Sequence, residues 1–161
     1  MDAIKLLKQQ HREVEKLFAQ FEKAETDDAR EELFTRIADN LAAHCLIEEK
    51  IFYPSVYVGP TEDKLKEAVE EHLGAKRLIS DLLDMEASDT QFTAKVKVLE
   101  EMIKHHVEEE ESELFKQVRK LLTRAELTSL GEQMQALFAE VIQTEPRLQV
   151  PAQTDEAPTL Q

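Results

Sequence analysis

The apolar residues of this chain recur at alternating steps of three and four, and this spacing limits the fold more than any other feature. The mean step matches the 3.6-residue turn of an α-helix, so each series marks the buried face of an amphipathic helix. Five such series follow one another along the 161 residues. They are Ile4, Leu7, His11, Val14, Phe18, Phe21; then Phe34, Ile37, Leu41, His44, Glu48, Ile51; then Leu65, Ala68, His72, Ala75, Ile79, Leu82; then Phe92, Val96, Leu99, Ile103, His106, Glu110, Leu114; and finally Leu127, Leu130, Met134, Leu137, Val141.

Short polar or proline-containing segments separate the five series. Helices of roughly 20–30 residues joined by short connections pack as antiparallel neighbours. We therefore predict an all-α protein with an up-down-up-down four-helix bundle over residues 1–122 and an accessory C-terminal helix over residues 123–144. The boundary signals are a break at Thr26–Asp28, an end of the second helix at Pro54, an N-cap at Thr61, and capping-box spacing in the pairs Ser88/Gln91 and Thr123/Glu126.

The last 17 residues differ from the rest of the chain. They contain three prolines and show no apolar periodicity. Segments of this composition rarely form regular structure. We therefore predict a disordered tail over residues 145–161.

Charge and cysteine content exclude several classes of protein. The formal net charge is −14, which opposes contact with nucleic acid and with anionic membrane surfaces. No apolar run approaches the roughly 20 residues needed to span a bilayer, and the N-terminus lacks the apolar core of a signal peptide. Cys45 is the only cysteine, so no intramolecular disulfide can form. We expect a cytoplasmic protein with no nucleic-acid or membrane partner.

Polar residues interrupt four of the five apolar series. A single buried histidine is most often a hydrogen-bonded core residue, and a single glutamate in such a series often reaches outward to solvent. Here all four bundle helices carry a histidine, and two of them add a glutamate one turn later, on the same face and about 5–6 Å away. Ionised carboxylates are almost never buried without a compensating charge or metal, so this coincidence favours one shared metal site. The six candidate ligands are His11, His44, Glu48, His72, His106 and Glu110.

The composition of this set favours some metals over others. Four imidazoles and two carboxylates are too many for one tetrahedral structural zinc, which also prefers thiolates. Calcium takes oxygen ligands and would not select four imidazoles. Mixed imidazole and carboxylate donors inside a four-helix bundle suit two iron ions bridged by carboxylates, although manganese or zinc could occupy the same ligands.

The second and fourth helices carry the same local pattern. In each, a glutamate follows the histidine by four residues and an aromatic residue follows it by nine. The chain therefore reads as two related helical hairpins. The matching residues are His44, Glu48 and Tyr53 in one hairpin, and His106, Glu110 and Phe115 in the other.

With these residues the chain resembles the hemerythrin family, specifically the bacterial hemerythrin-like HHE cation-binding proteins. The resemblance covers roughly residues 4–120 and implies a non-haem di-iron centre with an oxo or hydroxo bridge. It implies that Glu48 and Glu110 are bridging or terminal carboxylates and that the four histidines are terminal donors. The motifs that carry it are His11, the run from His44 to Glu49 with the Phe-Tyr-Pro that follows, the pair Glu71-His72, and the run from His105 to Glu111 with the Leu-Phe that follows.

Two departures from the oxygen-carrying members of that family affect the expected function. The carriers have a second histidine one turn after the ligand of the third helix, where this chain has Lys76. They also place an aspartate five residues after the histidine of the fourth helix, whereas in this chain the carboxylate is Glu110, four residues after His106. These departures argue against reversible oxygen carriage and favour chemistry with peroxide, nitric oxide or iron.

The neighbours of the ligands have simpler interpretations. We expect Tyr53 to be a packed aromatic residue, Lys76 to be solvated, and Cys45 to be a buried, inert thiol that points away from the site. Glu49 or Glu109 could act as an outer carboxylate to a ligand. We expect a surface or outer position for His105 and a solvated position for Glu111.

Two functions of different classes fit this sequence. The first is a metal centre that binds or turns over a small oxidant, O2, H2O2 or NO, with enzymatic activity left open. The second is an iron- or oxygen-sensing or metal-stabilised interaction module. In this alternative the metal stabilises the fold, and a protein partner that the sequence does not identify binds the metal-dependent form. A metal-free bundle is the third alternative.

Overall fold

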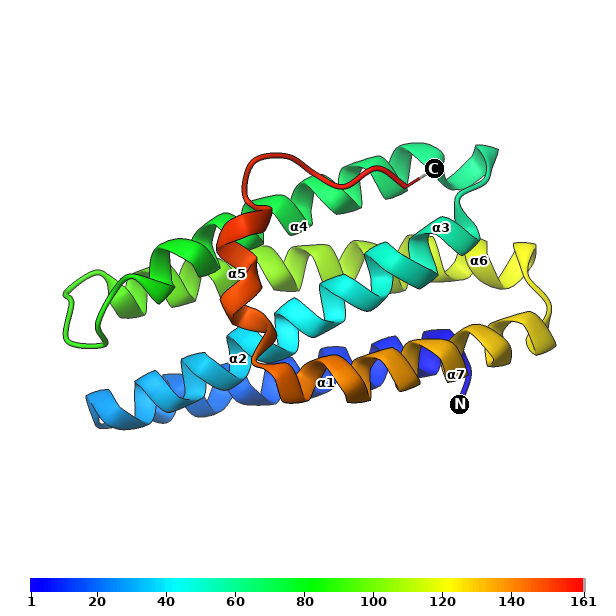
Figure 1. The fold of residues 1–161 in the computed structure, drawn as a ribbon. Coiled ribbons are helices and arrows are strands. Elements are labelled where there is room, and N and C mark those ends of the chain that lie inside the picture. Colours follow the sequence, from blue (N-terminus) through cyan, green and yellow to red (C-terminus); the bar gives the residue numbers. More distant parts are fainter. Residues whose placement is uncertain (161) are drawn as a thin grey trace.

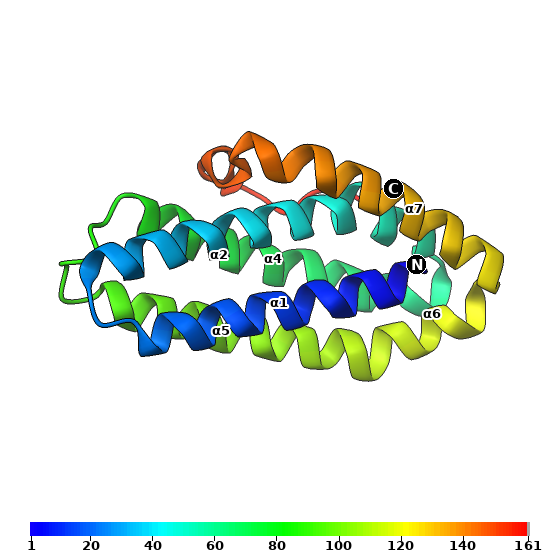
Figure 2. The same cartoon turned by 90° about the horizontal axis from the view of Figure 1, so that it is seen from below.

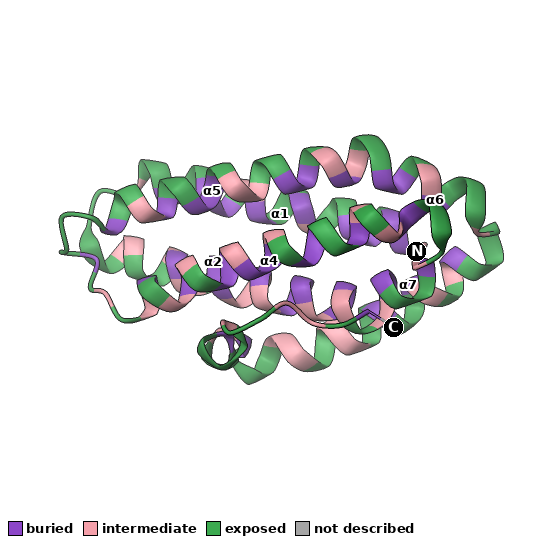
Figure 3. Ribbon diagram, turned by 90° about the horizontal axis from the view of Figure 1, so that it is seen from above, coloured by how far each residue is buried: buried purple, intermediate pink, exposed green. Residues whose placement is uncertain are grey.

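Four long helices form the body of the protein in the computed structural model, which describes residues 1–160 (Figure 1). They are α1 (Ala3–Lys23), α2 (Asp27–Ile47), α4 (Glu62–Leu83) and α5 (Phe92–Glu109). Sequential helices run antiparallel, and their buried faces point to a common interior (Figure 3). This arrangement confirms the predicted all-α bundle.

The helix ends follow local capping chemistry. Asp2 accepts a hydrogen bond from the Lys5 backbone N–H at 2.8 Å, and Thr26 accepts one from Ala29 at 3.1 Å. Both side chains satisfy backbone donors that the first turn of a helix leaves without partners. The predicted capping box of Thr123 forms in both directions with Glu126, at 3.2 and 2.7 Å.

Two other boundary predictions were wrong. Ser88 lies in a turn and the helix after it begins at Phe92, with Gln91 as the N-cap residue. Pro54 does not end the second helix, because helical backbone continues through Val56 as α3 (Tyr53–Val56). Proline is tolerated there because it directly follows the π-turn η1 (Glu48–Phe52), where the regular hydrogen bonding to the fourth residue back is already interrupted.

A π-helical turn interrupts both the second and the fourth helix of the bundle. The segment η1 (Glu48–Phe52) joins α2 to α3, and η3 (Glu110–Leu114) joins α5 to α6 (Phe115–Leu121). Single π-turns inside α-helices are rare and occur frequently at functional sites. Each one here begins at a candidate glutamate ligand.

The apolar core consists of two clusters on either side of the polar layer. One cluster lies toward the N-terminal end of α1 and includes Leu7, Ile47 and Phe115. The other lies toward the opposite end and includes Val14, Ile37 and Leu99. The candidate ligands therefore lie in the middle of the bundle with apolar packing above and below.

The accessory helix α7 (Arg124–Val141) lies along the outside of the bundle against α1 and α2 (Figure 2). Its contact with the chain start is close: a Cβ atom on Gly131 would lie 2.2 Å from the Met1 carbonyl oxygen. Only a glycine allows this approach. Leu127 and Met134 are buried on the same face of the helix.

The tail prediction differs from the structure. After the short helix η4 (Ile142–Thr144), residues 146–153 form the 3₁₀ helix η5 (Pro146–Gln153), which crosses α2 and α4 (Figure 1). Arg147 pairs with Asp39 at 3.0 Å, and Val150 and Leu160 are buried. These contacts order the segment without the apolar periodicity that would have predicted it. Residue 161, also assigned to the tail, lies outside the described residues.

No helix among residues 1–160 is long and apolar enough to cross a membrane.

Candidate metal centre

The two π-turns aim the candidate carboxylates and the aromatic residues that follow them toward the same point. In a π-turn the backbone N–H bonds to the carbonyl five residues back, as Tyr53 does to Glu48 and Phe115 to Glu110. The residue five positions after the glutamate is thereby brought under it. Tyr53 stacks beside His72 at a ring separation of 5.5 Å, and Phe115 stacks on His11 at 6.1 Å.

All six predicted ligands meet in the interior, and each is at most 6% exposed. His11 and His44 come from α1 and α2, and His72 and His106 from α4 and α5. The two glutamates come from η1 and η3. The structure thus brings together one layer of donors from all four bundle helices.

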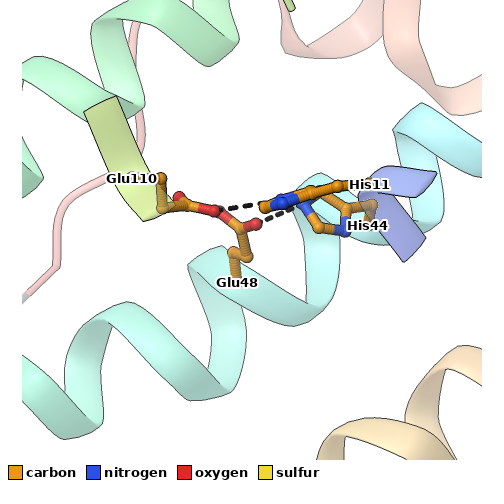
Figure 4. A group of neighbouring side chains, drawn as sticks. All are labelled: His11, His44, Glu48 and Glu110. Atoms are coloured by element: carbon orange, nitrogen blue, oxygen red, sulfur yellow. Dashed lines mark ion pairs between the residues drawn. The ribbon is translucent and has the colours of Figure 1, made fainter. Parts of the chain in front are cut away.

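The donors form two neighbouring groups, which we call the α1–α2 position and the α4–α5 position. At the α1–α2 position, His11 Nε2 lies 3.2 Å from Glu110 Oε1, and His44 Nε2 contacts Glu48 Oε1 (Figure 4). The ligand atoms of these four residues all lie within 4.8 Å of one another. This is the spacing of a site that can hold a cation.

At the α4–α5 position, His72 Nε2 lies 3.4 Å from Glu48 Oε2. His106 Nε2 lies 3.3 Å from Glu110 Oε2 and 3.3 Å from His72 Nε2. Each glutamate therefore turns one oxygen to each position. Each position therefore has its own two histidines beside the shared carboxylates, and at the α4–α5 position the ligand atoms of Glu48, His72 and His106 lie within 4.8 Å of one another.

The outer nitrogen of every ligand histidine has its own acceptor. Such partners fix the tautomer and orientation of a metal-binding imidazole, with the other nitrogen free to bind. Here Nδ1 is the nitrogen that is held, so all four Nε2 atoms face the centre. The Nδ1 distances are 3.2 Å from His11 to Glu111, 2.7 Å from His44 to Gln10, 2.7 Å from His72 to Glu49, and 2.7 Å from His106 to Glu71.

Buried polar atoms without hydrogen bonds test whether these residues fit a metal. Among residues 1–160, six buried side-chain nitrogen or oxygen atoms have no hydrogen-bond partner. Five of them belong to the centre: Nε2 of His11 and of His44, both oxygens of Glu48, and Oε1 of Glu110. These atoms lie near one another at angles that make no hydrogen bond. Leaving them unsatisfied is costly, and cations bound at both positions would satisfy all five.

Charge pairing inside the layer shifts the pKa values of its members in opposite directions. Burial alone lowers the pKa of His106, but Glu110 and Glu71 outweigh it and raise the pKa to about 10. Burial and the charge of Glu48 raise the pKa of Glu110, yet His106 and His11 bring it down to about 2. Without a cation, the carboxylates are therefore ionised and protons occupy places that a metal would take.

Tyr53 belongs to the site, contrary to the expectation of a merely packed aromatic residue. It is fully buried, and its hydroxyl donates a hydrogen bond to Glu110 Oε2 at 2.6 Å. The hydroxyl oxygen of Tyr53 also lies 3.4 Å from Nε2 of both His72 and His106. Burial and the charges of Glu110 and Glu48 hold the pKa of Tyr53 well above its usual value, so the group stays a neutral phenol. Its offset in the repeated pattern was the signal for this placement.

A small cavity of about 20 Å³ adjoins the four histidines. Its exposed walls are apolar, with Val14, Leu41 and Ile103 among the lining residues. Cys45 also lines this cavity, so it does not point away from the site, although it is a buried thiol as expected. The space holds about one water-sized molecule.

Lys76 was expected to be solvated, but it is buried. Its Nζ bonds Glu49 Oε1 at 2.9 Å, and Glu49 holds His72. The buried charge is retained because the carboxylate compensates it. His105 is 65% exposed and lies near Glu109 at 3.2 Å, which confirms its surface placement.

Fold and site together define a class: a helical bundle with buried His/Glu clusters able to hold metal. The chain belongs to the hemerythrin HHE cation-binding family, whose model, described as "Hemerythrin HHE cation binding domain", matches residues 2–118. A solved structure of a hemerythrin HHE cation-binding domain-containing protein from Mycobacterium kansasii shares the fold. It has a TM-score of 0.80 and 24% identity, and the match covers 89% of each chain.

One curated relative is longer than this chain. The chain is 26% identical over 138 residues to a "DNA nickase" of Nostoc sp. (strain PCC 7120). The match covers 86% of this chain and 39% of the relative. The shared region is therefore a minority of that protein.

Proposed function

We propose that the protein holds two metal ions, preferably iron, and uses them to bind or turn over a small oxidant such as O2, H2O2 or NO. The single observation that carries this proposal is the division of donors. Each position receives two Nε2 atoms, and both glutamates offer one oxygen to each position. Mixed imidazole and carboxylate donors of this kind suit iron, and manganese or zinc would accept the same set.

The chain itself supplies three elements of this function. The outer acceptors of the histidines hold all four rings with Nε2 toward the centre. Tyr53 keeps a proton on an oxygen that lies beside His72, His106 and Glu110. The small apolar cavity beside the histidines, of about 20 Å³, supports a small ligand better than a large substrate. Iron bound by the histidines and glutamates would supply one-electron redox chemistry and an open coordination position.

The alternative, a metal-stabilised module, has one observation in its favour. The six ligands come from all four bundle helices, so metal binding would tie them together. Metal binding free energy then becomes folding free energy. The two functions separate by whether the loaded protein reacts with an oxidant.

We propose no nucleic-acid substrate for this chain. The formal charge of −14 opposes contact with a phosphate backbone. The nickase relative shares only 39% of its length with this chain, so its activity is not carried over.

The test uses purified, iron-loaded protein exposed separately to O2, H2O2 and NO. We expect a change in the visible spectrum with at least one of them, or consumption of peroxide. His106→Ala should abolish the response, whereas His105→Ala, which removes the exposed neighbouring histidine, should keep it. An unchanged spectrum with all three, together with no peroxide consumption, would show that the proposed reaction does not occur.

A further inference from the structure

The two metal positions differ in what holds their histidines. At the α4–α5 position, both Nδ1 atoms face carboxylates: Glu49 for His72 and Glu71 for His106, each at 2.7 Å. At the α1–α2 position, His44 Nδ1 instead faces the amide oxygen of Gln10 at 2.7 Å. The fourth histidine, His11, faces the carboxylate of Glu111 at 3.2 Å.

A basic residue neutralises one outer carboxylate at each position. Lys76 binds Glu49 at 2.9 Å, and Arg12 binds Glu111. The two pairs carry the same net charge, although Lys76 is buried and Arg12 is 54% exposed. The difference that remains is the ionised acceptor Glu71 at one position against the neutral acceptor Gln10 at the other.

A carboxylate that accepts the Nδ1–H of a histidine makes the other nitrogen a stronger donor to a metal, and it adds a negative charge close to the cation. A neutral amide orients the ring without adding charge. We propose that the two positions are unequal: the α4–α5 position binds its ion more tightly and fills first, and Gln10 makes the α1–α2 position the weaker and more exchangeable one. This inference rests on the proposed two-metal centre.

The experiment titrates Co²⁺ into the metal-free full chain, under anaerobic conditions and against a competing chelator, and extracts two stepwise dissociation constants. For the wild type we expect two ions per chain, with constants at least about tenfold apart. Outer-shell substitutions at metal sites change affinity by about 10–100-fold. Gln10→Glu should therefore tighten the weaker constant by about tenfold or more, and Glu71→Gln should weaken the tighter constant by a similar factor.

Two control variants separate the hydrogen bond from long-range charge. Gln9→Glu adds the same charge at the exposed preceding position of α1, and Glu70→Gln removes the same charge at the exposed preceding position of α4. Both should shift either constant by less than about threefold. A gain of affinity in Gln10→Glu cannot come from misfolding, so this variant stays informative even if Glu71→Gln folds poorly.

Each outcome bears on a different claim. Equal constants in the wild type, an unchanged weaker constant in Gln10→Glu, or controls as effective as the test variants would overturn the inference while two ions still bind. Fewer than two ions in the wild type would overturn the proposed two-metal centre itself.

Discussion

If the proposed two-metal centre forms, replacing Glu110 by glutamine should remove a large part of the thermal stabilisation that bound metal provides. Glutamine keeps the size of the side chain but loses the charge that both positions share, since Oε1 lies 3.2 Å from His11 and Oε2 3.3 Å from His106. Removing even an outer partner of a ligand weakens metal binding about 10–100-fold, so losing a direct ligand should cost at least about 1.4–2.7 kcal/mol per ion, or about 3–5 kcal/mol for two. For a protein of this size, that corresponds to about 6–20 °C in Tm.

The assay is thermal unfolding with and without added metal, for the wild type and the variant. Taking the difference between loaded and metal-free Tm removes any effect of the substitution on the fold itself. Glu113→Gln is the matched control, because Glu113 lies in the same π-turn but is exposed and pairs with Lys64 at 2.5 Å. A Glu110→Gln protein that keeps the full metal-dependent gain in Tm would refute the assignment of Glu110 as a shared ligand.

Three further predictions concern pH, the accessory helix and the tail. Because the pKa of His106 is raised to about 10, its pairing stabilises the metal-free fold fully below pH 6.5, and this contribution falls as the pH rises toward 10. Because the pKa of Glu110 is lowered to about 2, its pairing contributes fully above pH 4.5, and this contribution falls as the pH drops toward 2. Urea unfolding of metal-free protein should therefore show a maximum of this contribution between about pH 4.5 and 6.5, and a rise in stability from pH 7 to 10 would contradict the pairing. Gly131→Ala should destabilise the fold by about 1–3 kcal/mol through overpacking, and the better helix propensity of alanine should return about 1 kcal/mol of this loss. We expect a lower Tm with unchanged metal content; a higher Tm would show that the contact with the chain start is not tight. Val150→Ala should cost about 2 kcal/mol in urea unfolding, whereas Leu148→Ala, at an exposed position, should cost little; equal effects would argue against a docked tail.

The bundle and the six donors could be predicted from sequence because both depend on helical periodicity. A residue on an apolar series of a long helix must face the core, and His11, His44, His72 and His106 meet because they also lie at similar heights along the antiparallel helices. The glutamates one turn after two of these histidines followed for the same reason. The structure places all six within one layer.

The surroundings of the site could not be predicted in the same way. The π-turns change the periodicity locally, so Tyr53, five residues after Glu48, turns inward where an α-helix would rotate it away. Lys76 is buried because Glu49 from another helix meets it, and only the tertiary packing shows that contact. The repeated offset of nine residues between histidine and aromatic residue was the one sequence signal that pointed to Tyr53.

The order of the C-terminal segment depends on isolated contacts between distant residues. Asp39 lies more than one hundred residues before its partner Arg147. Val150 fills a gap against α2 and α4 without any repeated apolar neighbour. Composition therefore predicted disorder where a few specific contacts hold the segment in place.

Anomalous diffraction at the iron edge from crystals of iron-loaded protein tests the central claim most directly. It locates and counts the metal ions together. The account predicts two peaks per chain, one between His11 and His44 and one between His72 and His106, with Glu48 and Glu110 reaching both. No peak, a single peak, or peaks at surface carboxylates would contradict it.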